Sequence, residues 1–429
     1  MSYNDTLIIP GGQTPHGEVT VSGAKNSATR LLAASTICDE IVTLSNYPVN
    51  LVDSRHKERF LKKNGISIQE KADQLIIDST NYTSVILDDF FYPIRTTYLL
   101  VAGQLKKQGI AYIPYPGGCN IGTRKYDIHI MVWEKFGCTV EEKNDYIEVK
   151  APRKIKGSNI EFPISTVGGT ENALLCASIA EGTSNISNAY ITPEIEDLIN
   201  FLKLAGVDIS IINQSYITVT GSNYLKGQNY SVMPDRIEAL TWIVYAAISE
   251  GNILIKNIPF TSMEIPLMYL KSAGLNYYQN SKDILVTPDC LSNGNMHAFE
   301  VACGTHPGII SDMQPFYVML GLKSLGTSRI HDYRYPERIS YIRELQKFVS
   351  KDISCQPGKI SINGPVEFKA ANASYTDLRG TMASVLAALC AKEGISKIEG
   401  VSMALRGYNN LREKLASLNI KTEYSALDE

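Results

Sequence analysis

The stretch EGTSNISNAYITPEIEDLINFLKLAGVDI, residues 181–209, has the pattern of one complete structural unit. A glycine turn is followed by an alternating strand pattern, a proline break, an amphipathic helix pattern, a second turn and another strand. The same order recurs five times along the chain. The residues aligned with Gly182 are Glu40, Gly109, Gly251, Gly326 and Gly394. The steps between consecutive copies are therefore 69, 73, 69, 75 and 68 residues.

A second helix pattern, rich in alanine and leucine, precedes the opening strand of a unit, as in 171–182, 238–251 and 382–394. A helix that is apolar nearly all round is typical of burial inside a domain. The 429 residues exceed what one hydrophobic core usually supports. We therefore predict an α/β protein of two pseudo-threefold domains with three units each. The alternative, a tandem array of unrelated modules, is disfavoured because solenoid periods are about 20–50 residues. A cleft between two domains is the default ligand site.

The composition is that of a globular protein, with 44% hydrophobic and 20% charged residues. The net charge of -3 argues against a broad nucleic-acid or membrane-binding surface, so an anion would need a local cluster of cations. The N-terminus lacks a secretory pattern, and no apolar run reaches the ~18 residues of a membrane span. The eight cysteines are scattered without CxxC pairs. This spacing predicts neither a metal site nor disulfides, and reduced thiols fit a cytoplasmic protein.

The loop PGGC, residues 116–119, places Cys119 directly after two glycines. Glycines permit a close approach of the backbone to a ligand, so we expect the thiol to be presented rather than packed. The alternative is a small buried hydrophobic side chain, which is the usual environment of a free cysteine. With Arg124 nearby, Cys119 could act as a thiolate or as a proton donor.

Several cations interrupt the repeated pattern where a helix or strand should begin. Lys25 and Asn26 precede an apolar helix, whose N-terminus favours an anion, although a solvated lysine is an equally ordinary reading. Four arginines lie at comparable junctions: Arg236, Arg338, Arg379 and Arg406. Because the chain has no basic excess, we interpret this set as a phosphate and carboxylate clamp.

Seven short motifs occur in a fixed order: SGAKN, PGGCNIGTR followed by Asp127 and His129, VGGTEN, PDRIE, SDMQ, TDLR and RGY. Together they resemble the UDP-N-acetylglucosamine 1-carboxyvinyltransferase family, from about residue 8 to residue 423. The related 5-enolpyruvylshikimate-3-phosphate synthases share the sixfold architecture but not the PGGC loop.

The resemblance implies a pair of inside-out α/β barrels. Residues 1–24 with 234–429 would form domain I, and residues 25–233 would form domain II with the mobile loop 115–124. It also implies transfer of the enolpyruvyl group of phosphoenolpyruvate to the 3-hydroxyl of UDP-N-acetylglucosamine, with release of phosphate through a tetrahedral ketal. This is the first committed step of peptidoglycan synthesis, needs no cofactor and is the target of fosfomycin. The partners would be these small molecules; the oligomeric state stays open, and a monomer is compatible.

The resemblance also implies roles for individual residues. Cys119 would protonate the methylene carbon of phosphoenolpyruvate, and Asp312 would be the base at the acceptor hydroxyl. The catalytic group would also include Lys25 and Arg406, which bind phosphate and carboxylate together with Arg95 and Arg124. The nucleotide sugar would contact Asn26, Arg95, Arg124, Lys125, Tyr126, Asp127, Thr166, Val167, Gly168, Asp312 and Arg334. The closed cleft would be completed by Arg338, Asp377 and Arg379.

The chain departs from the usual pattern of this family at Lys125, Tyr126, Glu337, Met403 and Leu405, and the lysine usual after the proline of YPVNLVD is absent. Lys125 and Tyr126 stand where the uracil is expected. A paralogous enolpyruvyl transferase that acts on another uridine nucleotide or nucleotide sugar is therefore an alternative. A catalytically silent relative that only binds nucleotide sugars is a third hypothesis, against which the presence of both Cys119 and Asp312 argues.

Overall fold

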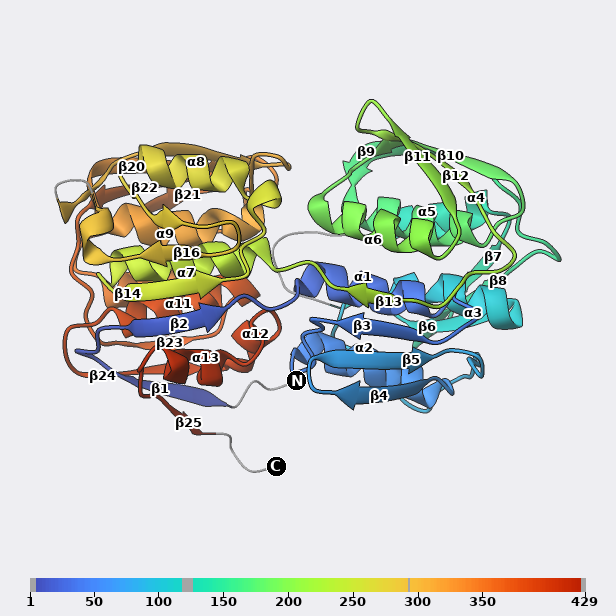
Figure 1. Cartoon of the computed structure of the whole chain (residues 1–429), viewed down its shortest axis with the longest axis horizontal. Helices are drawn as coiled ribbons and strands as arrows, with labels where there is room; N and C mark the ends of the chain where they lie inside the picture. The colour runs from blue at the N-terminus through green and yellow to red at the C-terminus, as the bar shows by residue number, and fades with distance from the viewer. Residues whose placement is uncertain (1–4, 118–125, 292–293, 426–429) are drawn as a thin grey trace. The chain divides into compact units, whose positions relative to one another are not determined.

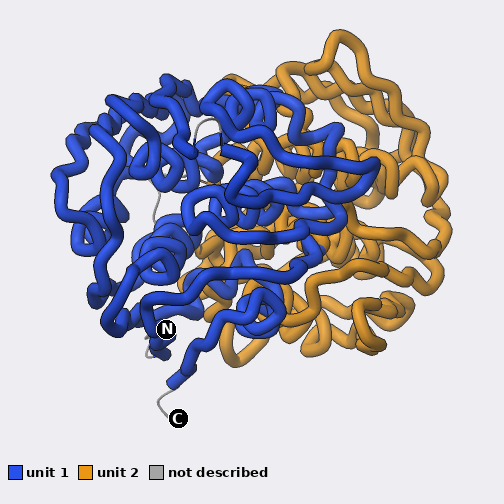
Figure 2. The backbone as a smooth tube through the Cα atoms, turned by 60° about the vertical axis from the view of Figure 1, so that its left-hand side comes forward, with its two compact units in different colours: residues 1–22, 119–123, 234–429 blue, residues 23–118, 124–233 orange. Residues whose placement is uncertain are grey.

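The computed structural model describes residues 5–117, 126–291 and 294–425. These residues divide into two compact units (Figure 2). Unit 1 contains residues 5–22, 234–291 and 294–425, and unit 2 contains residues 23–117 and 126–233. Among the described helices, none is long and apolar enough to cross a membrane.

Unit 2 consists of three sheets around buried helices (Figure 1). Its strands are β3 (Val42–Ser45), β4 (Ser67–Lys71), β5 (Gln74–Asp78), β6 (Ile110–Pro114), β7 (Thr139–Glu142), β8 (Tyr146–Lys150), β9 (Asn159–Thr166), β10 (Thr183–Ala189), β11 (Asp208–Ile212), β12 (Tyr216–Thr220) and β13 (Asn229–Ser231). Its helices are α1 (Lys25–Ser35), α2 (Val52–Lys63), η1 (Thr96–Leu100), α3 (Val101–Gln108), α4 (Asp127–Lys135), α5 (Val167–Ser178) and α6 (Pro193–Leu204). The strand orders are β13-β3-β5-β4, β6-β8-β7 and β11-β12-β10-β9.

Unit 1 repeats this plan. Its strands are β1 (Thr6–Pro10), β2 (His16–Thr20), β14 (Asn252–Lys256), β15 (Tyr278–Gln279), β16 (Ile284–Val286), β17 (Met296–His297), β18 (Glu300–Gly304), β19 (Ile309–Ile310), β20 (Ser324–Asp332), β21 (Ser354–Gln356), β22 (Lys359–Gly364), β23 (Asn372–Ser374), β24 (Ile395–Glu399) and β25 (Glu423–Ser425). Its helices are α7 (Arg236–Ile248), η2 (Phe260–Ser262), α8 (Glu264–Ser272), η3 (Pro288–Cys290), η5 (Ser311–Met313), α9 (Gln314–Leu322), α10 (Tyr341–Leu345), η6 (Gln346–Phe348), α11 (Leu378–Leu389), α12 (Ser402–Leu405) and α13 (Leu411–Ser417). The sheets are β15-β16-β14-β2, β23-β24-β1-β25 and one in which β18 and β22 flank β20.

Each sheet combines antiparallel pairs with, in five of the six described sheets, a parallel strand from another part of the chain. The N-terminal strands β1 and β2 pair with β24 and β14, respectively, so the chain start is integrated into unit 1. Helices α7, α9 and α11 are buried along every residue. The predicted class, two sets of three repeated α/β units with sheets outside and helices inside, is confirmed.

The backbone conformation explains why glycine recurs at the start of the repeated unit. Gly182 and Gly394 have φ angles of 87° and 82°, a left-handed conformation that glycine adopts without strain. This conformation turns the chain from a buried helix into the opening strand of the next unit. In the fourth copy the positive φ falls on Glu250, one residue before the aligned Gly251.

Each unit has its own hydrophobic core. The core of unit 1 includes Trp242 and Phe316, and the core of unit 2 includes Leu31 and Trp133. Helices α5 and α11 contribute alanine and leucine side chains that are almost fully buried. Because these rigid cores hold the starts of the central helices, polar side chains at those starts have fixed positions.

Candidate functional site

Four predicted site residues of unit 1 form one group, the Arg338 cluster: Asp312, Arg338, Asp377 and Arg379. Arg338 lies in the turn after β20. The Arg338 Nη1 donates to Asp312 Oδ1 at 2.6 Å, and its Nη2 donates to Asp377 Oδ1 at 2.6 Å. Arg379 Nε lies 3.8 Å from Asp312 Oδ2. The side chains of Arg338, Asp377 and Arg379 are at most 3% exposed, whereas that of Asp312 is 32% exposed. Asp312 is thus the member of this cluster that solvent or a substrate can reach.

Two helix starts position the carboxylates of the Arg338 cluster. Asp312 lies in η5, immediately before α9. Asp377 is the N-cap of α11, where its Oδ1 accepts hydrogen bonds from the backbone N–H groups of Arg379 at 3.1 Å and Gly380 at 3.4 Å. The local sequence therefore fixes Asp377 before any ligand is present.

Arg338 stays charged in this cluster, and some buried polar atoms of the cluster make no hydrogen bond to the described residues. Burial alone would lower the pKa of Arg338, but Asp377 and Asp312 raise it above the ordinary arginine value, so the guanidinium stays charged. Within the described residues, Arg338 Nε, Arg379 Nε, Arg379 Nη1 and Asp377 Oδ2 have no hydrogen-bond partner. Buried donors of this kind normally find an acceptor. These atoms are buried, so they rigidify the surroundings of Asp312 and do not themselves offer an exposed anion site.

The other two junction arginines are buried as well. Arg236 begins α7, and its Nη1 lies 3.4 Å from His306 Nδ1. Arg406 follows α12, and its Nη1 lies 3.9 Å from Met403 Sδ. Both arginines are at most 3% exposed, so neither is a solvated surface residue. Arg334, also a predicted ligand-binding residue, is half-buried in the turn that carries Arg338.

Lys25 is the first residue of α1 in unit 2. Among the described residues, no side chain caps this helix, and its first turn has no acidic residue, which suits an anion at its N-terminus. The Lys25 ammonium is paired with Asp53 Oδ2 of α2 at 2.8 Å. Asn26 follows, half-buried. An anion at Lys25 would therefore share this cation with Asp53.

Three further elements meet near Gly168 in unit 2. The Tyr98 ring of η1 stacks on the His129 ring of α4 with centroids 3.5 Å apart. A Cβ atom at Gly168 would lie 3.1 Å from both His129 Cε1 and the Tyr98 hydroxyl oxygen, so a larger residue would press on both rings. Burial, assisted by Arg95, lowers the pKa of His129 to about 3, which keeps its imidazole neutral. Arg95 is half-buried just before η1.

The remaining predicted nucleotide-sugar residues lie at the starts of α4 and α5. Thr166 is the N-cap of α5, and Val167 is the first residue of this helix. Tyr126 donates its hydroxyl hydrogen bond to Glu142 Oε2 at 3.1 Å, and Asp127 is exposed at the start of α4. The predicted residues Cys119, Arg124 and Lys125 lie outside the described residues.

We expect Thr166→Ala to lower the free energy of unfolding by about 1 kcal/mol, because the Thr166 Oγ1 accepts a hydrogen bond from the Gly169 N–H at 3.3 Å. Urea unfolding followed by circular dichroism measures this. Thr192 is the matched control, since it caps α6 without a side-chain hydrogen bond. Equal losses in Thr166→Ala and Thr192→Ala would contradict a capping role for Thr166.

Sequence reasoning missed a group of buried charges in unit 2: Arg30, Asp53, Lys57 and Glu171. Arg30 Nε forms an ion pair with Glu171 Oε2. A signal was present in the sequence, because Arg30 and Glu171 interrupt segments that are otherwise expected to be buried helices. His129 and Tyr98 were likewise given no role.

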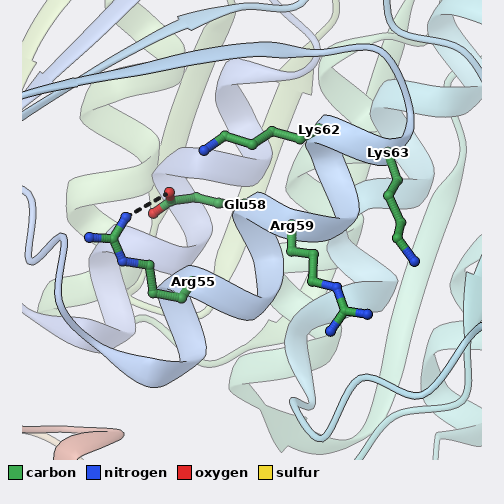
Figure 3. Close-up of a pocket in the computed structure, with 5 residues that line it drawn as sticks. All are labelled: Arg55, Glu58, Arg59, Lys62 and Lys63. Atoms are coloured by element: carbon green, nitrogen blue, oxygen red, sulfur yellow. Dashed lines mark ion pairs between the residues drawn. The ribbon is translucent and has the colours of Figure 1, made fainter.

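A hollow of about 430 Å³ lies on α2 and is lined by Arg55, Glu58, Arg59, Lys62 and Lys63 (Figure 3). None of these residues belongs to the predicted site. The two arginines are paired with Glu70 and Asp89, respectively. The hollow is therefore a charged surface feature separate from the residues above.

A family model described as EPSP synthase (3-phosphoshikimate 1-carboxyvinyltransferase) matches residues 6–415. The chain belongs to this family. A relative from Pelagibacter ubique, named UDP-N-acetylglucosamine 1-carboxyvinyltransferase, is 34% identical over 416 residues, covering 97% of this chain and 98% of the relative. A relative of the same name from Lawsonia intracellularis is 35% identical and covers 96% of this chain and 97% of its own length.

A solved enolpyruvyl transferase, NikO from Streptomyces tendae, has the same fold, with a TM-score of 0.85. The likeness covers 99% of this chain and 100% of the NikO chain at 19% sequence identity. It thus supports the inside-out α/β architecture of the family. The predicted resemblance to UDP-N-acetylglucosamine 1-carboxyvinyltransferases is confirmed by the family model and the sequence relatives, and the structural likeness confirms the fold.

Proposed function

We propose that this protein transfers the enolpyruvyl group of phosphoenolpyruvate to the 3-hydroxyl of UDP-N-acetylglucosamine and releases phosphate. The proposal rests mainly on sequence similarity. Over nearly the whole chain, the protein is similar to relatives that are named UDP-N-acetylglucosamine 1-carboxyvinyltransferase. Their names favour this acceptor over the alternative of another uridine nucleotide. Peptidoglycan synthesis is the pathway that such an activity would serve, in the cytoplasm.

In the proposed reaction, the acceptor oxygen adds to C2 of phosphoenolpyruvate while a proton is added to C3. Asp312 takes the hydroxyl proton, and Cys119 supplies the proton to the methylene carbon. The resulting ketal then loses a methyl proton and the phosphate group, which restores the double bond. The carboxylate of Asp312 suits the role of the base, because it is 32% exposed and is held in place by a hydrogen bond from Arg338 Nη1 at 2.6 Å.

Lys25, Arg95, Arg124 and Arg406 are proposed to hold the phosphate and carboxylate groups. Phosphoenolpyruvate has two to three negative charges, and fixed cations bind such a ligand and its departing phosphate. The nucleotide sugar is assigned to Asn26, Tyr126, Asp127, Thr166, Val167, Gly168 and Arg334, with Lys125. Domain closure through Arg338, Asp377 and Arg379 stays a prediction, as do the domain bounds 1–24 with 234–429 and 25–233.

Phosphate release tests the proposed function directly. Purified protein with phosphoenolpyruvate and UDP-N-acetylglucosamine is expected to release one phosphate for each enolpyruvyl product. Omission of either substrate is the control. Release with UDP-glucose or another uridine nucleotide but not with UDP-N-acetylglucosamine would support the paralogue, and no release with any acceptor would support the binding-only hypothesis.

Fosfomycin labelling tests the role of Cys119. Incubation with UDP-N-acetylglucosamine and this epoxide is expected to add one fosfomycin molecule to Cys119, because a presented thiol reacts as its thiolate. Peptide mass spectrometry locates the adduct. Cys355, which is exposed, is the matched internal control and should stay unmodified. Absence of an adduct on Cys119, or equal labelling of both thiols, would contradict the assignment.

A further inference from the structure

A buried charged group in unit 2 has no part in the proposed mechanism. Lys57 of α2 is 0% exposed, and its ammonium donates a hydrogen bond to the backbone carbonyl of Thr29 in α1 at 2.6 Å. Burial of a lysine is unfavourable unless its charge is paired. A position that retains such a residue in a hydrophobic core therefore requires an explanation.

A chain of contacts connects Lys57 to Lys25 through Thr29 and Asp53. The Thr29 Oγ1 donates to the carbonyl oxygen of Lys25 at 3.2 Å. The Lys25 Nζ pairs with Asp53 Oδ2 at 2.8 Å. Asp53 and Lys57 are four residues apart on α2 and so lie on one face of that helix. Helices α1 and α2 are thus joined twice, once by Lys57 and once by Lys25.

The charges that face Lys57 come from three helices: Glu171 of α5, Arg30 of α1 and Asp53 of α2. Burial lowers the pKa of Lys57 to about 7, Glu171 and Asp53 oppose this change, and Arg30 adds to it. Arg30 is itself paired with Glu171, whose Oε1 also accepts the Tyr98 hydroxyl hydrogen bond at 3.4 Å. The ammonium is therefore supported by a small set of charges that a nearby ligand can disturb.

We propose that Lys57 is a positioning residue for Lys25: it fixes α2 against the first turns of α1, so that Asp53 holds the Lys25 ammonium where an anionic group of phosphoenolpyruvate binds. This inference rests on the proposed function, because it assigns the anion at Lys25 to that substrate. Lys57 touches no substrate and acts through Lys25 and Asp53.

The proposal has a consequence for pH. An anion bound near Lys25 attracts the positive charge of Lys57, so binding favours the protonated form. By linkage, phosphoenolpyruvate binds more tightly when Lys57 is charged, and its KM rises as the pH increases through the pKa of about 7. Phosphoenolpyruvate titrates as well, so the informative quantity is the difference between wild type and variant in how KM depends on pH.

The experiment compares Lys57→Met with Lys106→Met in the full-length protein. Lys106 is a matched control, because its ammonium also donates to a carbonyl near α1, that of Ile37, at 2.7 Å, and pairs with Asp39. We expect Lys57→Met to raise the KM for phosphoenolpyruvate about tenfold below neutral pH, with kcat changed less than about twofold. The rise of KM with pH should also flatten, whereas Lys106→Met keeps the wild-type KM and pH profile.

Two outcomes would overturn the proposal: a wild-type KM and pH profile in Lys57→Met, or equal increases of KM in both variants, which would indicate a general loss of packing. Glu171→Gln is a second variant if Lys57→Met does not fold. It removes a charge that favours the protonated form of Lys57, so the inflection in the plot of KM for phosphoenolpyruvate against pH should move to lower pH. An unchanged inflection contradicts the proposal.

A readout without substrate separates this inference from the proposed function. Relative to Lys57→Met, the stability of the wild type should rise between pH of about 7 and 10.5, since only the unfolded lysine holds its proton in this window. Stability that is independent of pH across this window contradicts a buried, titrating Lys57. A wild type that shows this dependence but releases no phosphate would instead overturn the proposed function and, with it, the assignment of the ligand.

Discussion

Replacement of Arg338 by methionine is expected to lower the free energy of unfolding by about 3–5 kcal/mol and kcat by about 100-fold or more. The guanidinium donates to Asp312 and Asp377 through separate nitrogens at 2.6 Å each. Its removal leaves Asp377, which is 1% exposed, as a buried carboxylate without its cation. It also removes the contact that orients the proposed base.

Urea unfolding and steady-state kinetics measure the two effects of Arg338→Met. The double variant Arg338→Met/Asp377→Asn removes the unpaired charge, so it should recover part of the lost stability while kcat stays low. Arg338→Lys should keep the charge but fail to bridge both carboxylates, because one ammonium cannot replace the two-armed guanidinium. Arg59→Met is the control, since Arg59 pairs with Asp89 and both side chains are exposed, by 53% and 44%, and it should lose about 1 kcal/mol or less.

A different pattern would contradict this role of Arg338. If Arg338→Met and Arg59→Met lost similar stability, the buried pairs would contribute no more than a surface pair. If the double variant were less stable than Arg338→Met, the main loss would come from capping of α11 and not from an isolated charge. If kcat were retained, Arg338 would not orient Asp312.

The fold was predictable because each repeated unit has its own local sequence pattern of turn, strand and helix. The turn at Gly182, the amphipathic pattern of α6 and the alanine-rich pattern of α5 each follow from side-chain periodicity and backbone conformation. Six copies about 70 residues apart gave the number of units. The parallel pairing of β14 with β2 could not be predicted this way, because strand partners distant in sequence are chosen by tertiary packing.

The site was predictable as a set of residue types but not as a set of contacts. The motifs named Asp312 and Asp377, and the junction pattern named Arg338, yet nothing local shows that Arg338 bridges the other two across 26 and 39 residues of chain. Lys57 was missed for a related reason. Its position on a helix rich in lysine and arginine is typical of a solvated face, and only the packing of α1 and α5 makes it a buried cation.

Replacement of Asp312 by asparagine is expected to lower kcat by about 10²–10⁴-fold while the KM values for both substrates change little. The carboxamide oxygen of asparagine still accepts the hydrogen bond from Arg338 Nη1, so the geometry of the cluster is retained. What is lost is a group that can take the acceptor's hydroxyl proton. The effect should therefore appear in the chemical step.

Stability and a matched variant separate this chemical loss from misfolding. The asparagine oxygen still accepts the hydrogen bond from Arg338, but the buried Arg338 and Arg379 lose one carboxylate charge, so the melting temperature should fall less than in Arg338→Met. Asp39→Asn is the control, because Asp39 is a carboxylate of similar exposure that pairs with Lys106 and Lys107 in unit 2. It should change stability more than kcat.

Steady-state kinetics give the sharper test of Asp312 as a base. A kcat within about tenfold of the wild type, together with a raised KM for the acceptor, would make Asp312 a binding residue, and the base would then have to be sought elsewhere.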